Sequence, residues 1–125
     1  MTIEGKVVSG LGVAKIWIKK IEEIFLKKTN RKMFLGTLNL ELDYEYTFKP
    51  DIIIYKHEYG GNYDVHIKKC KILDDTAYIV RSVKNMQENG DYKLNIIEIM
   101  SEVNFRDKYK LVDGQSVKCL IEYIK

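Results

Sequence analysis

The sequence predicts a mainly β fold, a small closed barrel with one inserted α-helix. Short apolar runs are separated by glycines and other turn residues along most of the 125 residues, which is typical of strands joined by turns. Only one segment has the three- and four-residue spacing of an amphipathic helix. Because strands and helices do not alternate, the pattern argues against a doubly wound parallel sheet. A closed barrel fits best, because closure leaves no exposed strand edges.

The elements follow one another without a linker or a repeat. The predicted helix spans residues 17–28, where Trp17, Ile21, Ile24 and Phe25 form an apolar side that should be buried. Strands are expected at residues 5–9, 34–42, 52–55, 63–73, 77–82, 94–100 and 117–124. The polar residues 86–92 predict a loop, and residues 104–110 predict a short C-terminal helical turn before the tight turn at Asp113-Gly114.

Length and composition indicate one domain over residues 1–125. Hydrophobic residues make up 46% of the chain and charged residues 31%, as in globular proteins, which excludes a disordered chain. No apolar run approaches the roughly 18 residues of a membrane span. The amino-terminal residues lack the apolar stretch of a secretory signal, so we expect a cytoplasmic protein. We also expect it to be a monomer.

Charge, cysteine and histidine exclude several classes of site. The net charge of +3 comes from 21 Lys and Arg against 18 Asp and Glu, interleaved along the chain, so we expect a solvated surface and no nucleic-acid partner. Cys70 and Cys119 lie in apolar alternating stretches and should be buried, reduced thiols. His57 and His66 lack zinc-ligand spacing.

The most informative segment is the predicted strand at residues 34–42. Thr37, Asn39 and Glu41 should share one face, and the core should receive Phe34, Leu38, Leu40 and Leu42. Thr37 and Asn39 would then lie roughly 6.6 Å apart. Their hydroxyl and amide oxygens could hold a Mg²⁺ ion that takes its other ligands from water and substrate phosphates. The alternative is a polar strand face that only meets solvent.

Two further segments could carry chemistry. Between a strand and a helix, S-G-L-G-V-A-K at residues 9–15 could turn backbone N–H groups toward an anion, with Lys15 adding charge, or it could be an ordinary turn. Glu98 stands alone among branched apolar residues and could face either a site or solvent. Arg106 could bind a phosphate or pair with Asp107 or Glu102.

Taken together, three blocks of sequence resemble the CTP-dependent riboflavin kinases of archaea. They are E-G-K-V-V-S-G-L-G at residues 4–12, G-T-L-N-L-E-L-D at residues 36–43, and I-I-E-I at residues 96–99 with Phe105-Arg106 and L-V-D-G-Q-S-V at residues 111–117. The blocks fall in the order of the family and span nearly the whole chain. As a set they are specific, although each is weak alone.

The resemblance implies a six-stranded cradle-loop barrel and an enzyme that transfers the γ-phosphate of CTP to the 5′-hydroxyl of riboflavin. The products would be FMN and CDP, with Mg²⁺ as the cofactor. Carried over by position, the Mg²⁺ ligands are Thr37 and Asn39, and the catalytic, flavin-contacting acid is Glu98. The nucleotide-binding residues are Gly10, Leu11, Gly12, Val13, Ala14 and Lys15, together with Val103, Asn104, Phe105 and Arg106.

Departures from the family pattern leave two other hypotheses open. The loop at residues 10–15 has fewer glycines than the family loop, and Ser101-Glu102 replaces an Ala-Pro pair. These differences favour a non-catalytic flavin or nucleotide sensor on the same barrel. A small-barrel DNA-binding protein is the third hypothesis, because related barrels include transcription factors, and the dispersed charge argues against it.

Overall fold

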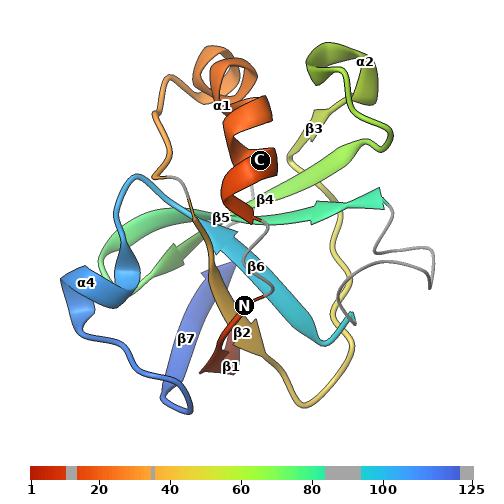
Figure 1. The fold of residues 1–125 in the computed structure, drawn as a ribbon. Helices are drawn as coiled ribbons and strands as arrows, with labels where there is room; N and C mark the ends of the chain where they lie inside the picture. Colours follow the sequence, from red (N-terminus) through yellow and green to blue (C-terminus); the bar gives the residue numbers. More distant parts are fainter. Residues whose placement is uncertain (11–13, 35, 84–93, 122–125) are drawn as a thin grey trace.

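Six antiparallel strands close into a barrel in the computed structural model (Figure 1). The structure describes residues 1–10, 14–34, 36–83 and 94–121, with the backbone alone for residues 14–17. The described strands are β1 (Thr2–Val8), β2 (Leu38–Glu41), β3 (Ile52–Ile54), β4 (Val65–Ile72), β5 (Asp75–Ser82), β6 (Ile96–Met100) and β7 (Ser116–Ile121). The described helices are α1 (Ala14–Thr29), α2 (Lys56–Tyr59) and α4 (Phe105–Tyr109).

The strand order shows how the barrel closes. The sheet runs β3-β4-β5-β6-β2-β1-β7, and β7 pairs again with β4, where Cys70 lies opposite Ile121 and Ile72 opposite Cys119. Among the described strands, β3 pairs only with β4 and lies outside the closed ring. The prediction of a closed six-stranded barrel is therefore confirmed, and β3 is an additional outer strand.

Apolar side chains form two layers, one inside the barrel and one outside it. Alternation in β1 and β7 sends Ile3, Val7, Val117, Cys119 and Ile121 into the barrel interior. Gly5 is also buried, and a Cβ atom there would lie 2.9 Å from both Leu40 Cβ and Leu42 Cδ2. Only glycine therefore fits at this crossing of β1 and β2 without displacing a neighbour.

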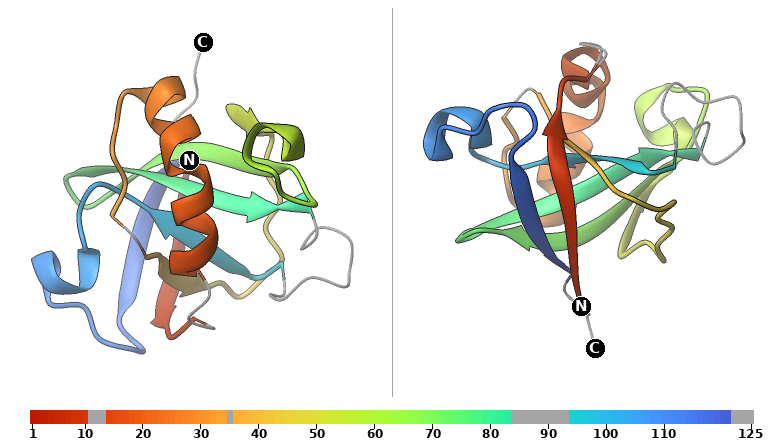
Figure 2. Two further views of the ribbon diagram at one scale, coloured as in Figure 1. Left: turned by 45° about the horizontal axis from the view of Figure 1, so that its top comes forward. Right: turned by 90° about the horizontal axis from the view of Figure 1, so that it is seen from below.

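The outer layer lies beneath α1, which crosses one face of the barrel (Figure 2). Ile18, Ile21 and Phe25 of α1 are fully buried. They share a cluster with outward-facing residues of four strands, namely Ile54, Val65, Ile67, Tyr78, Val80 and Met100. The predicted burial of Ile21 and Phe25 is confirmed, and the side chain of Trp17 lies outside the described residues.

Several predicted boundaries differ from the structure. Strand β1 begins earlier than predicted, and α1 begins at Ala14, because Ala14 and Lys15 are good helix formers that extend the first turn. The short helix α2 was not predicted; the Glu58 carboxylate caps it by accepting a hydrogen bond from Tyr55 N at 2.7 Å. The predicted loop at residues 86–92 and the end of the last predicted strand lie outside the described residues.

Phe34 was predicted to face the core, and this was wrong. The residues before Leu38 are not part of β2, and the Phe34 side chain is 43% exposed. Gly36 has φ of 156°, and a Cβ atom there would lie 3.0 Å from Phe34 Cε1. This backbone conformation interrupts the strand alternation before β2 begins, so the predicted face does not extend back to Phe34.

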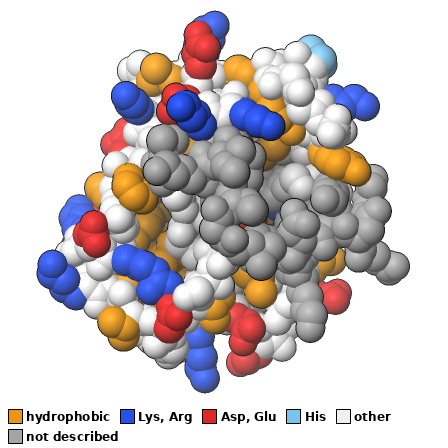
Figure 3. Space-filling view, viewed as in Figure 1, with side chains coloured by type: hydrophobic (Ala, Val, Ile, Leu, Met, Phe, Trp, Pro, Cys, Tyr) orange, Lys and Arg blue, Asp and Glu red, His pale blue; other side chains and the backbone are white. Residues whose placement is uncertain are grey.

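The described surface carries charges of both signs. On the face drawn in Figure 3, Lys and Arg side chains are interspersed with Asp and Glu. Among the described residues, no helix combines the length and apolar character needed to span a membrane.

Phe25 should make one of the largest side-chain contributions to the attachment of α1. Its ring packs edge-on against Tyr78, with ring centroids 4.9 Å apart and planes at 82°. We expect Phe25→Ala to lower the free energy of unfolding by about 3–5 kcal/mol, because it leaves a cavity in a buried cluster. The neighbouring Leu26→Ala is the control, since Leu26 is exposed and should cost less than about 1 kcal/mol. Urea denaturation measures both, and equal losses would contradict this packing.

Candidate functional site

Three polar side chains, Thr37, Asn39 and Glu98, gather on the outer face of the barrel. Alternation along β2 turns Leu38 and Leu40 inward and Asn39 outward. In the same way β6 turns Ile97 and Ile99 inward and leaves Glu98 outside. Because Asn39 and Glu98 are direct partners in the β2–β6 ladder, the register brings an amide and a carboxyl group together.

Long hydrogen bonds connect this cluster. The Thr37 hydroxyl donates to Glu98 Oε2 at 3.5 Å, and Asn39 Nδ2 donates to Thr37 Oγ1 at 3.5 Å. Asn39 is 6% exposed and Glu98 is 7% exposed. The alternative of a polar face that only meets solvent is therefore wrong for these two residues. Bonds of this length are weak, so the Thr37 oxygen can still accept a stronger partner.

Asn39 Oδ1 is the unusual atom of the cluster. It is buried, and it accepts no hydrogen bond within the described part of the chain. A buried carbonyl oxygen without a partner costs about 1–3 kcal/mol, so such atoms point to a role in binding. Two neutral oxygens, Asn39 Oδ1 and Thr37 Oγ1, with a carboxyl group beside them, fit a hard cation such as Mg²⁺ that takes most of its shell from water and phosphates. The described residues contain no group of three His, Cys, Asp or Glu side chains that could hold a metal without such help.

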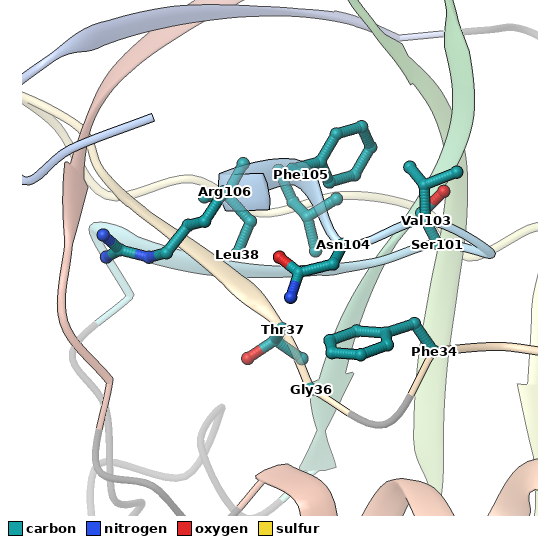
Figure 4. Close-up of a pocket in the computed structure, with 10 residues that line it drawn as sticks. Phe34, Gly36, Thr37, Leu38, Ser101, Val103, Asn104, Phe105 and Arg106 are labelled. Atoms are coloured by element: carbon teal, nitrogen blue, oxygen red, sulfur yellow. The ribbon is translucent and has the colours of Figure 1, made fainter. Parts of the chain in front are cut away.

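A cavity of about 190 Å³ opens beside Thr37 (Figure 4). One wall comes from the segment that leads into β2, and the other from the end of β6 and the start of α4. A backbone hydrogen bond of 2.8 Å from Phe34 N to Ser101 O joins the two walls. The lining residues are Phe34, Gly36, Thr37, Leu38, Ile99, Ser101, Val103, Asn104, Phe105 and Arg106. All four predicted residues at 103–106 therefore meet Thr37 at one cavity, which Asn39 and Glu98 do not line.

Helix α4 is held by its own cap and by the β4–β5 turn. Asn104 Oδ1 accepts a hydrogen bond from Asp107 N at 3.3 Å, which caps the first turn. Asp75, the first residue of β5 after that turn, accepts hydrogen bonds from Lys108 Nζ and Tyr109 Oη. Lys108 first, and then Tyr109, hold the pKa of the Asp75 carboxyl below its usual range. Helix α4 is therefore held both by its own cap and by Asp75.

Arg106 pairs with Asp113, whereas the pairing alternatives that the sequence offered were Asp107 and Glu102. Its Nη2 donates to Asp113 Oδ1 at 2.6 Å and to Val8 O at 3.3 Å. Glu102, which is absent from the family pattern, instead forms an ion pair with Arg31, with Glu102 Oε1 3.5 Å from Arg31 Nη1. Pairing by sequence proximity failed because α4 turns the guanidinium toward the end of β1 (Figure 4).

The other predicted nucleotide-binding segment follows β1. Gly10 directly follows the end of that strand, and residues 11–13 lie outside the described part of the chain. Ala14 and Lys15, predicted as loop residues, are in the first turn of α1.

Arg81 is a buried cation that the sequence did not single out. It is 4% exposed, and it donates to the carbonyl oxygens of Tyr46, Leu94 and Ile96 while its guanidinium lies 5.6 Å from the centre of the Phe48 ring. Burial lowers the pKa of Arg81, and the charges of Tyr46 and Glu98 act in the opposite direction. These bonds fix the start of β6, the strand that carries Glu98. The one sequence signal for the burial of Arg81 was its position next to the apolar residues of a predicted strand.

One family model matches this chain over most of its length. The family model of the CTP-dependent riboflavin kinases, which carries the description "Domain of unknown function DUF120", matches residues 7–121. The match covers nearly the whole chain, from the interior of β1 to the end of β7. Because this match covers well over half of the chain, the protein belongs to the CTP-dependent riboflavin kinase family.

Proposed function

We propose that this protein phosphorylates riboflavin at the 5′-hydroxyl with CTP as the donor, releasing FMN and CDP. Membership of the family supports the general activity. The observation that carries the proposal is the buried Asn39 Oδ1, which has no hydrogen-bond partner in the described structure and lies in a cluster with Thr37 and Glu98.

In this reaction the 5′-oxygen of riboflavin forms a bond to the γ-phosphorus of CTP. The bond from that phosphorus to the β–γ bridging oxygen breaks, and the hydroxyl proton leaves. Glu98 either orients the ribityl chain or accepts this proton, and its buried position suits both roles, because a carboxylate forms its strongest hydrogen bonds away from water.

Thr37 Oγ1 and Asn39 Oδ1 would hold the Mg²⁺ ion of the Mg²⁺–CTP complex. When bound, the ion neutralises charge on the phosphate oxygens. The protein's part is to hold the two side chains close together before the ligand arrives, with Nδ2 of the Asn39 amide group 3.5 Å from Thr37 Oγ1. Preformed geometry of this kind lowers the entropic cost of binding.

The nucleotide would extend from this cluster toward the cavity lined by residues 103–106. Arg106 would contribute charge on one side, and the residues after β1, from Gly10 to Lys15, would contribute backbone N–H groups on the other. Phe34, Val103 and Phe105 make the rest of the cavity wall apolar, which suits a planar ring.

A direct assay tests the proposal. The protein is incubated with riboflavin, Mg²⁺ and one nucleoside triphosphate at a time, and FMN is separated by chromatography. We expect FMN with CTP and its loss when EDTA removes the metal ion. Absence of FMN with every nucleotide, despite bound riboflavin, would contradict the kinase.

Binding of riboflavin without formation of FMN is the outcome that the sensor hypothesis predicts. The sequence at residues 10–15 favours the sensor, because it has fewer glycines than the family pattern, and fewer glycines leave fewer backbone N–H groups free to turn toward phosphate. A sensor should bind riboflavin and CDP in a calorimetric titration and still form no FMN in the assay above, whereas a kinase should bind both and form FMN.

A further inference from the structure

The turn before β7 brings an acidic residue to the end of β1. Gly114 N donates to Val7 O at 2.7 Å, and Val7 N donates to Gln115 O at 2.8 Å. Gly114 has φ of 89°, which glycine adopts without strain. The Asp113 carboxylate is therefore carried by a turn that two backbone hydrogen bonds fasten to β1.

Each oxygen of this carboxylate has its own partner. Oδ1 accepts from Arg106 Nη2 at 2.6 Å, and Oδ2 accepts from the Ser9 hydroxyl at 2.7 Å. Asp113 thus joins α4 to the residue that immediately precedes Gly10. These hydrogen bonds, from Arg106 first and Ser9 second, lower the pKa of the Asp113 carboxyl.

The contact with Asp113 leaves part of Arg106 available. Nη2 uses its hydrogens on Asp113 and Val8 O, whereas neither Nε nor Nη1 has an acceptor in the portion of the chain that the structure describes. The side chain lines the cavity beside Thr37. A guanidinium held in this way can still form charge-assisted hydrogen bonds to a phosphate.

We propose that Asp113 is a positioning residue for the nucleotide, one that fixes Arg106 and Ser9 in the arrangement that receives the phosphates of CTP. The inference rests on the proposed function, and it assigns to the D-G turn a role in nucleotide affinity. A long arginine side chain loses much rotamer freedom when it binds a ligand. Because Asp113 has already fixed Arg106, binding does not incur that loss again.

The opposite effect would follow if Asp113 competed with phosphate for Arg106. Removing the carboxylate would then strengthen nucleotide binding. The two cases differ in sign, so one substitution separates them.

The structure offers a matched control on the same helix. Asp75 binds Lys108 at 2.8 Å and Tyr109 at 2.5 Å, so it also fastens α4 through a carboxylate. Within the described residues, Asp75 forms no hydrogen bond with Arg106 or Ser9. Asp75→Asn therefore loosens α4 and leaves the Arg106–Asp113–Ser9 contacts in place.

The experiment is a calorimetric titration of CDP with Mg²⁺, and separately of riboflavin, into the parent protein, Asp113→Asn and Asp75→Asn. We expect Asp113→Asn to weaken CDP binding roughly tenfold and to leave riboflavin binding unchanged. Asp75→Asn should lose thermal stability and keep CDP affinity within about twofold of the parent. In the Arg106→Gln background, Asp113→Asn should have little further effect, because its main partner is gone.

Three results would overturn the inference: equal loss of CDP affinity in both asparagine variants, stronger CDP binding by Asp113→Asn, or an undiminished tenfold effect in the Arg106→Gln background. A parent protein that binds no CDP would contradict the proposed function itself, and the inference with it.

Discussion

Glu98→Gln should lower the affinity for riboflavin ten- to a hundredfold. The change keeps the size and shape of the side chain and removes its charge. A hydrogen bond to a charged group contributes about 1.5–3 kcal/mol, and each 1.4 kcal/mol is tenfold in affinity. Quenching of flavin fluorescence measures the affinity directly. FMN formation should fall at least as far, since Glu98 either orients the ribityl chain or accepts its proton.

Stability gives a second readout for Glu98. The residue is 7% exposed, and burial of a carboxylate is costly. The ligand-free Glu98→Gln protein should therefore be as stable as the parent or more stable. Glu41→Gln is the matched control, because Glu41 projects from the same outer face of β2 and is exposed. Equal riboflavin affinities for the parent and Glu98→Gln would leave the flavin role without support.

Asn39→Leu should abolish Mg²⁺-dependent nucleotide binding and lower FMN formation by at least a hundredfold. Loss of a residue that only supports a metal ligand costs 10–100-fold in metal affinity, and loss of a ligand should cost at least as much. Leucine has the branched shape of asparagine and no oxygen to offer. Thr37→Val, which keeps the shape of threonine, should act in the same direction. Titration of CDP in the presence and absence of Mg²⁺ measures the effect.

The same substitution should not destabilise the ligand-free protein. Asn39 Oδ1 has no hydrogen-bond partner in the described structure, so its removal relieves a desolvation cost, and stability should hold or rise by about 1 kcal/mol. Asn95→Leu is the control: Asn95 Nδ2 donates to Leu42 O at the far end of the β2–β6 pair, and its loss should leave metal dependence unchanged. If Asn39→Leu retains the Mg²⁺ dependence of the parent, Asn39 is not a ligand.

Much of the fold follows from local pattern. The spacing of Ile21 and Phe25 identified α1 and its buried side, and the leucines of β2 identified the face turned to the core. These features depend on the periods of a helix (3.6 residues) and of a strand (2 residues). Each period can be recognised within a single short segment, without knowledge of the rest of the fold. The same alternation placed Asn39 and Glu41 opposite those leucines.

Phe34 shows where alternation ends. Its parity with Leu38 predicted burial, but parity is valid only inside a continuous strand. Gly36 lies between Phe34 and Leu38, and its backbone conformation interrupts the strand. Phe34 instead forms part of the cavity wall. The sequence pattern alone does not distinguish such a position from a buried position in the core.

Residue type and family resemblance were enough to propose each of Thr37, Asn39 and Glu98 as a site residue. Whether these side chains lie close together depends on which strands pair. Asn39 and Glu98 face each other because β2 lies beside β6 in the closed barrel, although two other barrel strands separate them along the chain. Likewise Arg106 has neighbours of opposite charge in sequence, and it binds Asp113 because a turn fastened to β1 presents that carboxylate. Local pattern determined the elements and their faces, since short-range sterics and burial decide these. Strand order, register and ion-pair partners were decided by closure of the barrel, since they depend on long-range packing that no single segment contains.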